Sequence, residues 1–473
     1  CAIFIFQTRP KEECIMANKI MRKVFLACAI IISIVYVSMY YDNGEYTKGN
    51  INEYVCKIYE IYNVPGLSVA IIDGDNEYYI NYGESIDENS RFELGSTTKA
   101  FTALGILKLE QEGKLKITDS VSDYLPWFKP TYKRTAYDVS IEDLLCHTSG
   151  VPSWTISTIP EGEDTDESLL IRTIQNIQEI QLDSEPGTYH EYATINYDIL
   201  ALIIEEVSGE KYEEFISSEI LTPLDMQDSF FRTNDEDADK MVRGHKTGFF
   251  SPFVYDSPTY YGNTAAGYLV SNTSDLMKWM KNWSIESQDE LGLVKDVLNY
   301  DVSEKGNYYA GWNIYEGYIC HGGNNPNFSS QVIISREKRQ GVFVLSNLAG
   351  SSATNIGDGI YRLLLGDTIR IGLQTDANGL VDFLSIVMAL LLIYFTMLLW
   401  DRKSPRACIV RVTVGTASIV AMLIVPFIFH YPYKVIYVWF PVTVCMTLTI
   451  TLTIALINIF AGCFWWFRDK MGS

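Results

Sequence analysis

Four apolar segments stand apart in this chain of 473 residues. They cover residues 24–40, 380–400, 407–429 and 435–460, and the last three are each long enough to cross a bilayer as a helix. The first segment is shorter and follows a basic cluster, so it is either an uncleaved anchor or a signal peptide. The lack of a clear small-x-small cleavage site favours the anchor. The pattern predicts one N-terminal and three C-terminal membrane helices.

Between these segments, shorter apolar runs alternate with polar turns. Residues 66–80 have the alternation and the glycine turn of a β-hairpin, and residues 96–112 form an apolar helix that ends at Gly113. Near the far end, the pattern predicts four short strands and a final helix, at 308–312, 318–320, 331–335, 341–345 and 353–365. Strands at both ends indicate one α/β sheet made from the two ends of this region, and the loop-rich middle would form a second, mainly helical lobe.

These patterns divide the chain into an N-terminal signal or anchor segment (1–41), a folded domain (42–379) and a three-helix transmembrane domain (380–473). Because basic residues stay on the cytoplasmic side, we expect a multi-pass protein of a bacterial cell membrane with its folded domain outside the cytoplasm. The basic clusters that agree on this topology are Lys19, Arg22 and Lys23, then Arg402, Lys403 and Arg406, and finally Arg468 and Lys470.

Charge and cysteine content narrow the function further. The net charge of −21 disfavours nucleic acid and anionic lipid as partners. Only Cys56, Cys146 and Cys320 lie in the folded domain, and an odd, widely spaced trio is not a disulfide framework. Two of them precede a histidine, but no Cys-x-x-Cys or His-x-x-x-His spacing accompanies them. We therefore expect neither a metal nor another cofactor.

The segment Gly95-Ser-Thr-Thr-Lys99 is the clearest candidate for chemistry. A serine three residues before a lysine, on one turn of a helix, points both side chains at the same place. A buried lysine loses its proton more easily and can then act as the base for the serine. The pair can therefore form an acyl-enzyme.

The Ser-x-x-Lys spacing alone is weak evidence, because it also occurs at Ser208/Lys211 and at Ser335/Lys338. The first of these pairs lies at the end of a predicted helix, and the second lies in a strand that leads into a turn. Only Ser96 opens a long helix, where free backbone N–H groups favour a developing anion.

Three further segments follow Ser96 in order along the chain. Residues 144–150 include Cys-His-Thr-Ser-Gly, Tyr192 lies between a Pro-Gly turn and an apolar helix, and residues 321–324 are His-Gly-Gly-Asn. Together these motifs resemble the serine penicillin-recognising family, in its class C β-lactamase-like branch of esterases, D-aminopeptidases and D,D-peptidases. The resemblance covers about residues 54–365. It implies an α/β fold, with an antiparallel sheet flanked by helices and a mainly helical second lobe.

The resemblance also implies roles by position. Ser96 would be the nucleophile, Lys99 its proton partner and Tyr192 a second acid/base group, because a tyrosinate beside a lysine ammonium has a lowered pKa. His321 occupies a catalytic position where penicillin-binding proteins and β-lactamases usually carry lysine, and a mostly neutral imidazole attracts a substrate carboxylate less. An edge strand after His321 would present the backbone N–H of Asn324 opposite that of Ser96 as the oxyanion hole.

Substrate preference is less defined. The family often has asparagine where this chain has Thr194, so an amide contact to the substrate is lost or replaced by a hydroxyl. Thr194, Gly323, Asn324 and Asn325 are the expected substrate-binding residues, although the Asn-rich run is equally compatible with ordinary loop chemistry. In this branch His147 belongs to a turn that shapes the lobe, so we assign it a structural role.

The whole architecture resembles the membrane-bound peptidases of the colibactin and zwittermicin pathways, which activate antibiotic and toxin precursors. This resemblance implies removal of an N-acyl-D-asparagine cap from an acylated, lipopeptide-like substrate at the membrane. A D,D-carboxypeptidase or peptidoglycan-editing enzyme and a broad esterase remain alternatives.

A membrane-tethered receptor for β-lactams or cell-wall fragments is an alternative of another class. The short loop at residues 401–406 leaves little room for a signalling domain, which argues against a receptor. Association of copies through the transmembrane helices stays open.

Overall fold

The computed structural model describes residues 11–162, 168–284, 289–301, 306–373, 377–400 and 404–471. The chain divides into two compact units. We call the first the α/β unit, which comprises Asn43–Lys246 and Pro252–Gly372. The other is the helical unit, which comprises Cys1–Asp42, Thr247–Ser251 and Leu373–Ser473.

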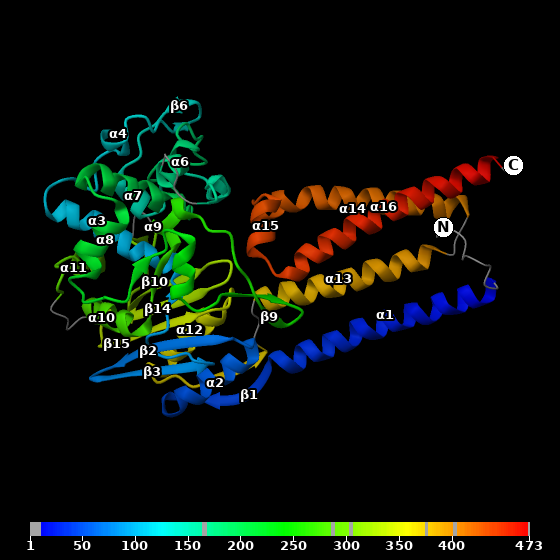
Figure 1. Cartoon of the computed structure of the whole chain (residues 1–473), viewed down its shortest axis with the longest axis horizontal. Coiled ribbons are helices and arrows are strands. Elements are labelled where there is room, and N and C mark those ends of the chain that lie inside the picture. The colour runs from blue at the N-terminus through cyan, green and yellow to red at the C-terminus, as the bar shows by residue number, and fades with distance from the viewer. Residues whose placement is uncertain are drawn as a thin grey trace. The chain divides into compact units, whose positions relative to one another are not determined.

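A seven-stranded antiparallel sheet forms the centre of the α/β unit (Figure 1). Its strands follow the order β11-β12-β13-β14-β15-β2-β3, so the hairpin near the start of the unit pairs with strands from its end. This confirms the prediction of one sheet from two distant chain segments. The strands are β2 (Gly66–Asp73), β3 (Asn76–Gly83), β11 (Tyr308–Tyr309), β12 (Trp312–Ile314), β13 (Tyr318–Asn324), β14 (Ser329–Ser335) and β15 (Gln340–Ser346).

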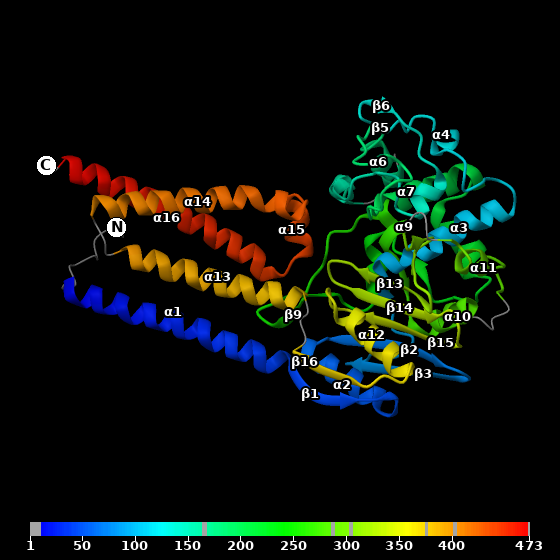
Figure 2. The same cartoon turned by 180° about the vertical axis from the view of Figure 1, so that it is seen from behind.

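Helices cover both faces of this sheet. On β15, Phe343 contacts Trp279 of α10 (Thr273–Trp283), with ring centroids 6.1 Å apart. The next residue, Val344, points to the opposite face and lies near Gly357 of α12 (Ser352–Leu364). In turn, α2 (Ile51–Tyr62) packs against α12 (Figure 2). Burial on both faces explains why every residue of β15 after its first is buried.

The middle of the unit is mainly helical, as predicted. Its two central helices, α3 (Lys99–Gln111) and α7 (Ile195–Ser208), pack against each other. All ten residues from Ile195 to Ile204 are buried, so α7 has no polar stripe. The other elements are α4 (Val121–Tyr124), α5 (Ile141–Leu145), α6 (Leu169–Gln175), α8 (Tyr212–Ile216), α9 (Thr264–Gly267), α11 (Val294–Leu298), the strands β4 (Phe92–Glu93), β10 (Leu269–Ser271) and β7 (Phe230–Phe231), and the pair β5 (Thr131–Tyr132) and β6 (Thr135–Ala136).

The chain bends where a single strand was expected at residues 308–312. Ala310 and Gly311 have positive φ angles of 52° and 84°, and they separate β11 from β12. A Cβ atom on Gly311 would lie 2.4 Å from the backbone nitrogen of Ala100, so only glycine lets the bend approach the start of α3. The predicted helix over residues 96–112 begins as the 3₁₀ turn Gly95–Thr98 and becomes α-helical at Lys99.

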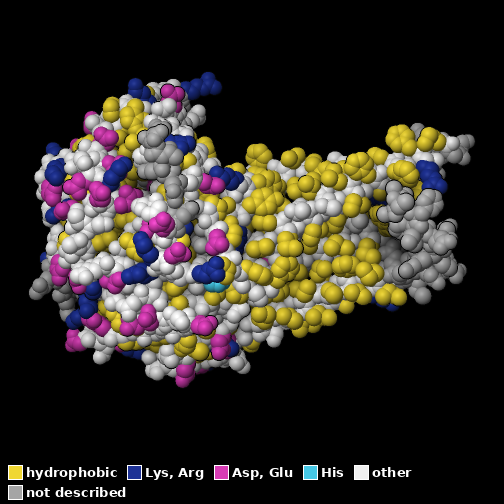
Figure 3. All heavy atoms as spheres, viewed as in Figure 1, with side chains coloured by type: hydrophobic (Ala, Val, Ile, Leu, Met, Phe, Trp, Pro, Cys, Tyr) yellow, Lys and Arg dark blue, Asp and Glu magenta, His cyan; other side chains and the backbone are white. Residues whose placement is uncertain are grey.

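Four helices lie side by side in the helical unit (Figures 1 and 2). They are α1 (Lys11–Tyr40), α13 (Ala377–Trp400), α14 (Pro405–Phe429) and α16 (Val442–Met471), with the short α15 (Tyr433–Trp439) between the last two. Each of the four is long and apolar enough to cross a membrane, as the sequence predicts. Hydrophobic side chains cover the visible face of this bundle (Figure 3). Arg402 and Lys403, on which part of the predicted topology rests, lie outside the described residues.

Two short strand pairs complete the fold. β1 (Tyr41–Tyr46) pairs with β16 (Ile369–Leu373), and β8 (His245–Gly248) forms a hairpin with β9 (Ser251–Val254). The turn of that hairpin, Phe249–Phe250, lies in the segment Thr247–Ser251, which belongs to the helical unit.

Candidate active site

Ser96 and Lys99 lie together where the 3₁₀ turn Gly95–Thr98 passes into α3. Lys99 Nζ is 3.2 Å from Ser96 Oγ, 3.1 Å from Thr194 Oγ1 and 2.8 Å from the carbonyl oxygen of Ala266. Lys99 is completely buried, whereas Ser96 is the one residue from Gly95 to Lys99 that is partly exposed. The arrangement gives a hydroxyl that a substrate can reach and an amine that water cannot.

Burial changes the acid–base chemistry of this amine. It lowers the pKa of Lys99 to about 7, and the nearby carboxylate of Asp198 opposes the shift. The pKa of Asp198, which is fully buried in α7, is raised well above its usual range by burial, and the charge of Lys99 opposes that shift. With its amide nitrogen turned toward Asp198, Asn263 donates to both carboxylate oxygens, at 3.1 and 2.8 Å. Sequence reasoning missed Asp198, although one aspartate inside an apolar helix was a visible signal.

Tyr192 lies beside the same amine. Lys99 Nζ is 5.1 Å from the centre of the Tyr192 ring and 5.7 Å from that of Tyr197. The Tyr192 ring also packs against His147, with ring centroids 4.2 Å apart. The structure therefore brings the three residues expected to share the proton transfer, Ser96, Lys99 and Tyr192, into one cluster.

His147 holds the segment that carries Tyr192. Its Nδ1 accepts the backbone N–H of Ala193 at 3.4 Å and lies 3.1 Å from Nδ2 of Asn196. Burial and the charge of Lys99 lower the pKa of His147 well below its ordinary value, so the ring is neutral. These contacts are those of a residue that orients its neighbours, in line with the structural role expected for His147.

His321 lies inside β13 rather than after it. Its Nδ1 donates to the carbonyl oxygen of Gly322 at 2.8 Å, which leaves Nε2 to accept from the Tyr308 hydroxyl at 3.0 Å. Burial and the charge of Lys99 lower the pKa of His321 to about 3. The imidazole is therefore neutral, and it adds no cation to the site.

The end of β13 approaches the turn before Ser96. β13 is not the outermost strand that was expected, but its pairing with β12 ends at Cys320 while its pairing with β14 continues to Asn324. Residues 321–324 therefore extend past the pairing with β12 and form a local edge of the sheet. A Cβ atom on Gly95 would lie 2.7 Å from the backbone nitrogen of Asn324, and one on Gly323 would lie 2.0 Å from the carbonyl oxygen of Leu94. Both glycines allow this close backbone approach.

The side chains expected to bind substrate make contacts within the protein. The Thr194 hydroxyl faces Lys99. Asn324 Oδ1 accepts the backbone N–H of Gly350 at 3.0 Å. Asn325 is buried, and its Nδ2 donates to Glu93 at 2.7 Å and to the carbonyl oxygen of Gly267 at 2.9 Å. This geometry suits a scaffold better than a direct substrate contact for Asn325.

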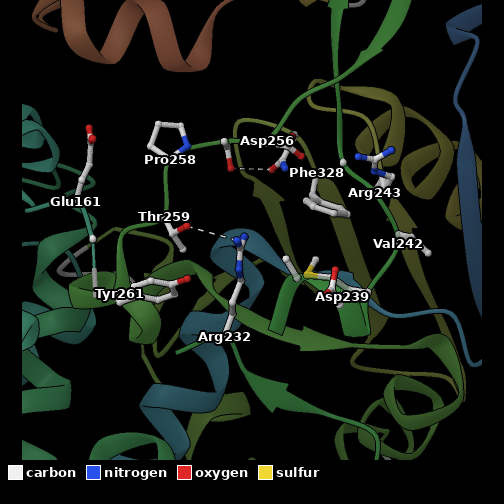
Figure 4. Close-up of a pocket in the computed structure, with 16 residues that line it drawn as sticks. Glu161, Arg232, Asp239, Val242, Arg243, Asp256, Pro258, Thr259, Tyr261 and Phe328 are labelled. Atoms are coloured by element: carbon white, nitrogen blue, oxygen red, sulfur yellow. Dashed lines mark hydrogen bonds between the residues drawn. The ribbon is translucent and has the colours of Figure 1, made fainter. Parts of the chain in front are cut away.

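A buried ion pair between Glu93 and Arg232 lies next to the segment that carries Ser96. Glu93 Oε1 is 2.8 Å from Nη1 of Arg232, and Arg232 Nη2 lies 3.4 Å from Thr259 Oγ1. Arg232 and Thr259 line a cavity of about 930 Å³ that also includes Tyr261 and Phe328 (Figure 4). Glu93 precedes Ser96 by three residues, so the ion pair connects the wall of the cavity to the turn that carries the candidate nucleophile.

An antiparallel sheet with a helical lobe, and a Ser-x-x-Lys pair between them, define the class of β-lactamases and penicillin-binding proteins. The chain belongs to the β-lactamase family, whose family model matches residues 51–367.

Two relatives illustrate this membership. Protein flp from Staphylococcus aureus (strain MRSA252) is 31% identical over 304 residues, which are 60% of this chain and 60% of that protein. The putative penicillin-binding protein PbpX from Bacillus subtilis (strain 168) is 29% identical over 285 residues, which are 58% of this chain and 66% of that protein. The chain thus spans about 60% of the length of the flp proteins that it matches.

Solved structures agree on the fold. The octameric penicillin-binding protein homologue from Pyrococcus abyssi superposes with a TM-score of 0.57 at 26% identity, over 67% of this chain and 77% of that one. FmtA from Staphylococcus aureus superposes with a TM-score of 0.56 at 23% identity, over 68% of this chain and 90% of that one, and shows the fold alone.

Proposed function

We propose that this protein is a membrane-bound serine hydrolase that acts through an acyl-enzyme on Ser96. The observation that carries the proposal is the 3.2 Å contact between Lys99 Nζ and Ser96 Oγ, in a site that lowers the pKa of Lys99 to about 7. A substantial fraction of the amine is then neutral at physiological pH and can accept the serine proton.

The reaction follows from this geometry. Neutral Lys99 takes the proton from Ser96 Oγ as the oxygen attacks the substrate carbonyl carbon and forms the C–O bond. The backbone N–H groups of Ser96 and Asn324 stabilise the negative charge that develops on the carbonyl oxygen. The C–N bond then breaks, and the leaving amine takes a proton from the Lys99–Tyr192 pair. In deacylation a water molecule gives a proton to the pair and attacks the acyl carbon. The C–O bond to Ser96 then breaks, and Ser96 Oγ takes that proton from the pair, which regenerates the free serine and the neutral amine.

For the substrate, we propose an amide next to a D-residue, with an N-acyl-D-asparagine cap as the first candidate. The neutral His321 supports a substrate without a carboxylate at that position, because no lysine cation is present there to attract one. The D-asparagine preference rests on the architecture, since Thr194 and Asn325 already contact Lys99 and Glu93. Other groups would have to recognise the carboxamide.

Mass spectrometry of membranes that carry the protein tests both the role of Ser96 and the preference for a D-asparagine substrate. The membranes are incubated with an N-myristoyl-D-asparaginyl amide, its L-asparagine counterpart, a D-Ala-D-Ala peptide and a simple ester. Ser96→Ala should abolish every hydrolysis that the wild-type chain performs. The matched control is Ser208→Ala, which removes the serine of the second Ser-x-x-Lys sequence and should retain full activity.

The outcomes separate the candidates. Release of myristoyl-D-Asn from the D-form alone supports the precursor-activating peptidase. Hydrolysis of the D-Ala-D-Ala peptide without action on acyl-D-Asn supports a D,D-carboxypeptidase. Cleavage that persists in Ser96→Ala membranes contradicts the catalytic assignment. An acyl adduct on Ser96 that never turns over supports the receptor.

We also propose that the α/β unit lies outside the cytoplasm. Basic residues, among them Lys19, Lys23 and Arg406, lie at the ends of the predicted spans that are far from the α/β unit in the sequence. Because such residues stay in the cytoplasm, the opposite ends of the spans and the α/β unit would lie outside. Protease added to intact spheroplasts should degrade the α/β unit, whereas a cytoplasmic unit would be degraded only after lysis.

A further inference from the structure

The hairpin of β8 and β9 has an unusual turn. Phe249 and Phe250 form its two-residue connection, with positive φ angles of 50° and 58°. Two consecutive positive φ angles define a type I′ turn, which strongly prefers Asn-Gly or similar residues. Bulky side chains are strained in this left-handed region, so contacts outside the turn must hold it in place.

A carboxylate from a membrane helix supplies those contacts. The two oxygens of Asp382, on α13, accept the backbone N–H of Phe249 at 3.1 Å and of Phe250 at 2.7 Å. Thr443, on α16, donates its hydroxyl to the same carboxylate. All of these groups belong to the helical unit, and Asp382 has no exposed surface. An acidic residue in an apolar helix is expensive unless it is paired, so its position indicates a specific role.

A third helix, α1, also contacts the turn. The ring of Tyr36, on α1, lies 5.9 Å from that of Phe250 and 4.5 Å from that of Phe383, measured between centroids. Residues from α1 and α13 therefore contact the turn, and α16 contributes through Thr443, which holds the Asp382 carboxylate.

The base of the same hairpin lies in the α/β unit and holds the loop after β13. The backbone N–H of His245 donates to the carbonyl oxygen of Asn327 at 3.0 Å, and Asn327 Nδ2 donates to the carbonyl oxygen of Tyr255 at 3.1 Å. A Cβ atom on Gly244 would lie 2.4 Å from Asn327 Nδ2, so the backbone approaches this side chain closely. Asn327 is three residues after Asn324, the candidate oxyanion donor.

We propose that Asp382 is a positioning residue for the active site. It fixes the strained Phe249–Phe250 turn, and the β8–β9 hairpin carries that constraint along the chain to the loop at Asn327 and so to Asn324. The part of this inference that concerns catalysis rests on the proposed function, whereas the constraint on the turn does not.

Hydrogen–deuterium exchange of the full-length chain in detergent tests the constraint directly. Asp382→Ala removes both acceptors and should speed exchange of peptides that contain Phe249 and Phe250 by about tenfold or more. The matched control is Asn458→Ala, which removes a polar side chain from α16 that bonds Thr396 instead of the turn. Unchanged exchange in Asp382→Ala would overturn the proposal.

Acylation of Ser96, followed by intact-mass measurement, tests the link to catalysis. Asp382→Ala should slow acylation by about tenfold, because a small displacement of the oxyanion donor is costly for the rate. Faster exchange at the turn with unchanged acylation would overturn the positioning role. If the wild-type chain forms no acyl adduct, the proposed function fails, and exchange still decides whether Asp382 holds the turn.

A rescue variant distinguishes the turn from a general loss of helix packing. Phe249→Asn combined with Phe250→Gly installs residues that adopt positive φ without external support. In that background, Asp382→Ala should change the acylation rate less than about twofold, because the turn no longer needs the carboxylate. A full tenfold loss in the rescued background would show that Asp382 acts through helix packing and would overturn the proposal.

Discussion

Nε2 of His321 accepts a hydrogen bond from the Tyr308 hydroxyl at 3.0 Å. Because Nδ1 of the same ring donates to the carbonyl oxygen of Gly322, both ring nitrogens are occupied by uncharged partners. The pKa of His321 is lowered to about 3, so its charge does not change in the neutral range. Any ionisation that controls activity near pH 7 must come from another group.

If Lys99 is the base, as we propose, that group is Lys99. Its pKa is lowered from 10.5 to about 7, so the amine is protonated below this pH and neutral above it. The acylation rate of Ser96 should rise about tenfold per pH unit below the pKa and level off above it. Intact-mass measurement of adduct formation from pH 5 to 9 checks this profile. A second inflection near pH 6.5 that disappears in Tyr308→Phe would contradict a neutral His321.

Lys99→Arg should lower acylation by about 10²–10⁴-fold at pH 8, because a guanidinium stays protonated and cannot act as a base. The same adduct assay measures the loss. Lys211→Arg, in the second Ser-x-x-Lys sequence, is the matched control and should leave the rate unchanged. Retention of activity by Lys99→Arg would identify Tyr192 as the base.

Asp198→Asn should shift the acidic limb of the pH profile to lower pH. The Asp198 carboxylate raises the pKa of Lys99, and its removal leaves the lowering effect of burial unopposed. The shift is measured as the midpoint of the acylation profile, with the exposed Asp225→Asn as the control. An unchanged midpoint would mean that Asp198 already carries a proton in this range.

Gly323→Ala should reduce acylation by about 10²–10³-fold, because a Cβ atom 2.0 Å from the carbonyl oxygen of Leu94 would push the oxyanion strand away from Ser96. Gly317→Ala is the matched control, since a Cβ atom there meets nothing within 4 Å. Tryptophan fluorescence during heating reports whether either variant unfolds. Equal rates for the two variants would argue against Asn324 as an oxyanion donor.

The Glu93–Arg232 pair predicts a stability effect. Arg232→Met should destabilise the α/β unit by about 3–5 kcal/mol, because it leaves a buried carboxylate without its cation. Glu93→Gln combined with Arg232→Met should recover part of that loss, since no buried charge then remains. Urea unfolding followed by tryptophan fluorescence measures these two variants and Glu93→Gln alone. A double variant that simply sums the single effects would show that the two charges are not coupled.

Some of this site could be predicted from the sequence because the signals are local. The helical spacing of Ser96 and Lys99 requires their side chains to meet, and the alternation over residues 66–80 requires a hairpin. The partners of these groups come from elsewhere in the chain. Asp198 reaches Lys99 only because α7 packs on α3, and no periodic pattern encodes that meeting.

The internal use of Thr194 and Asn325 could not be predicted for the same reason. A sequence shows which side chains carry a hydroxyl or an amide. The packing of the chain decides whether that group forms hydrogen bonds with the protein or with a substrate. The turn at Phe249–Phe250 could not be predicted either, because a type I′ turn prefers Asn-Gly or similar residues and this one has two phenylalanines. The acceptor that stabilises it, Asp382, is far along the chain.

The strand order has a consequence for the timing of synthesis. β2 carries Ile72, and its partner Gly341 on β15 is made only after the whole helical lobe. Ser96 therefore emerges from the ribosome long before β13 exists to supply Asn324. If Ser96 is the nucleophile and Asn324 an oxyanion donor, as we propose, an unfinished chain has a serine and a lysine without an oxyanion hole and gains activity only when the last strands have joined the sheet.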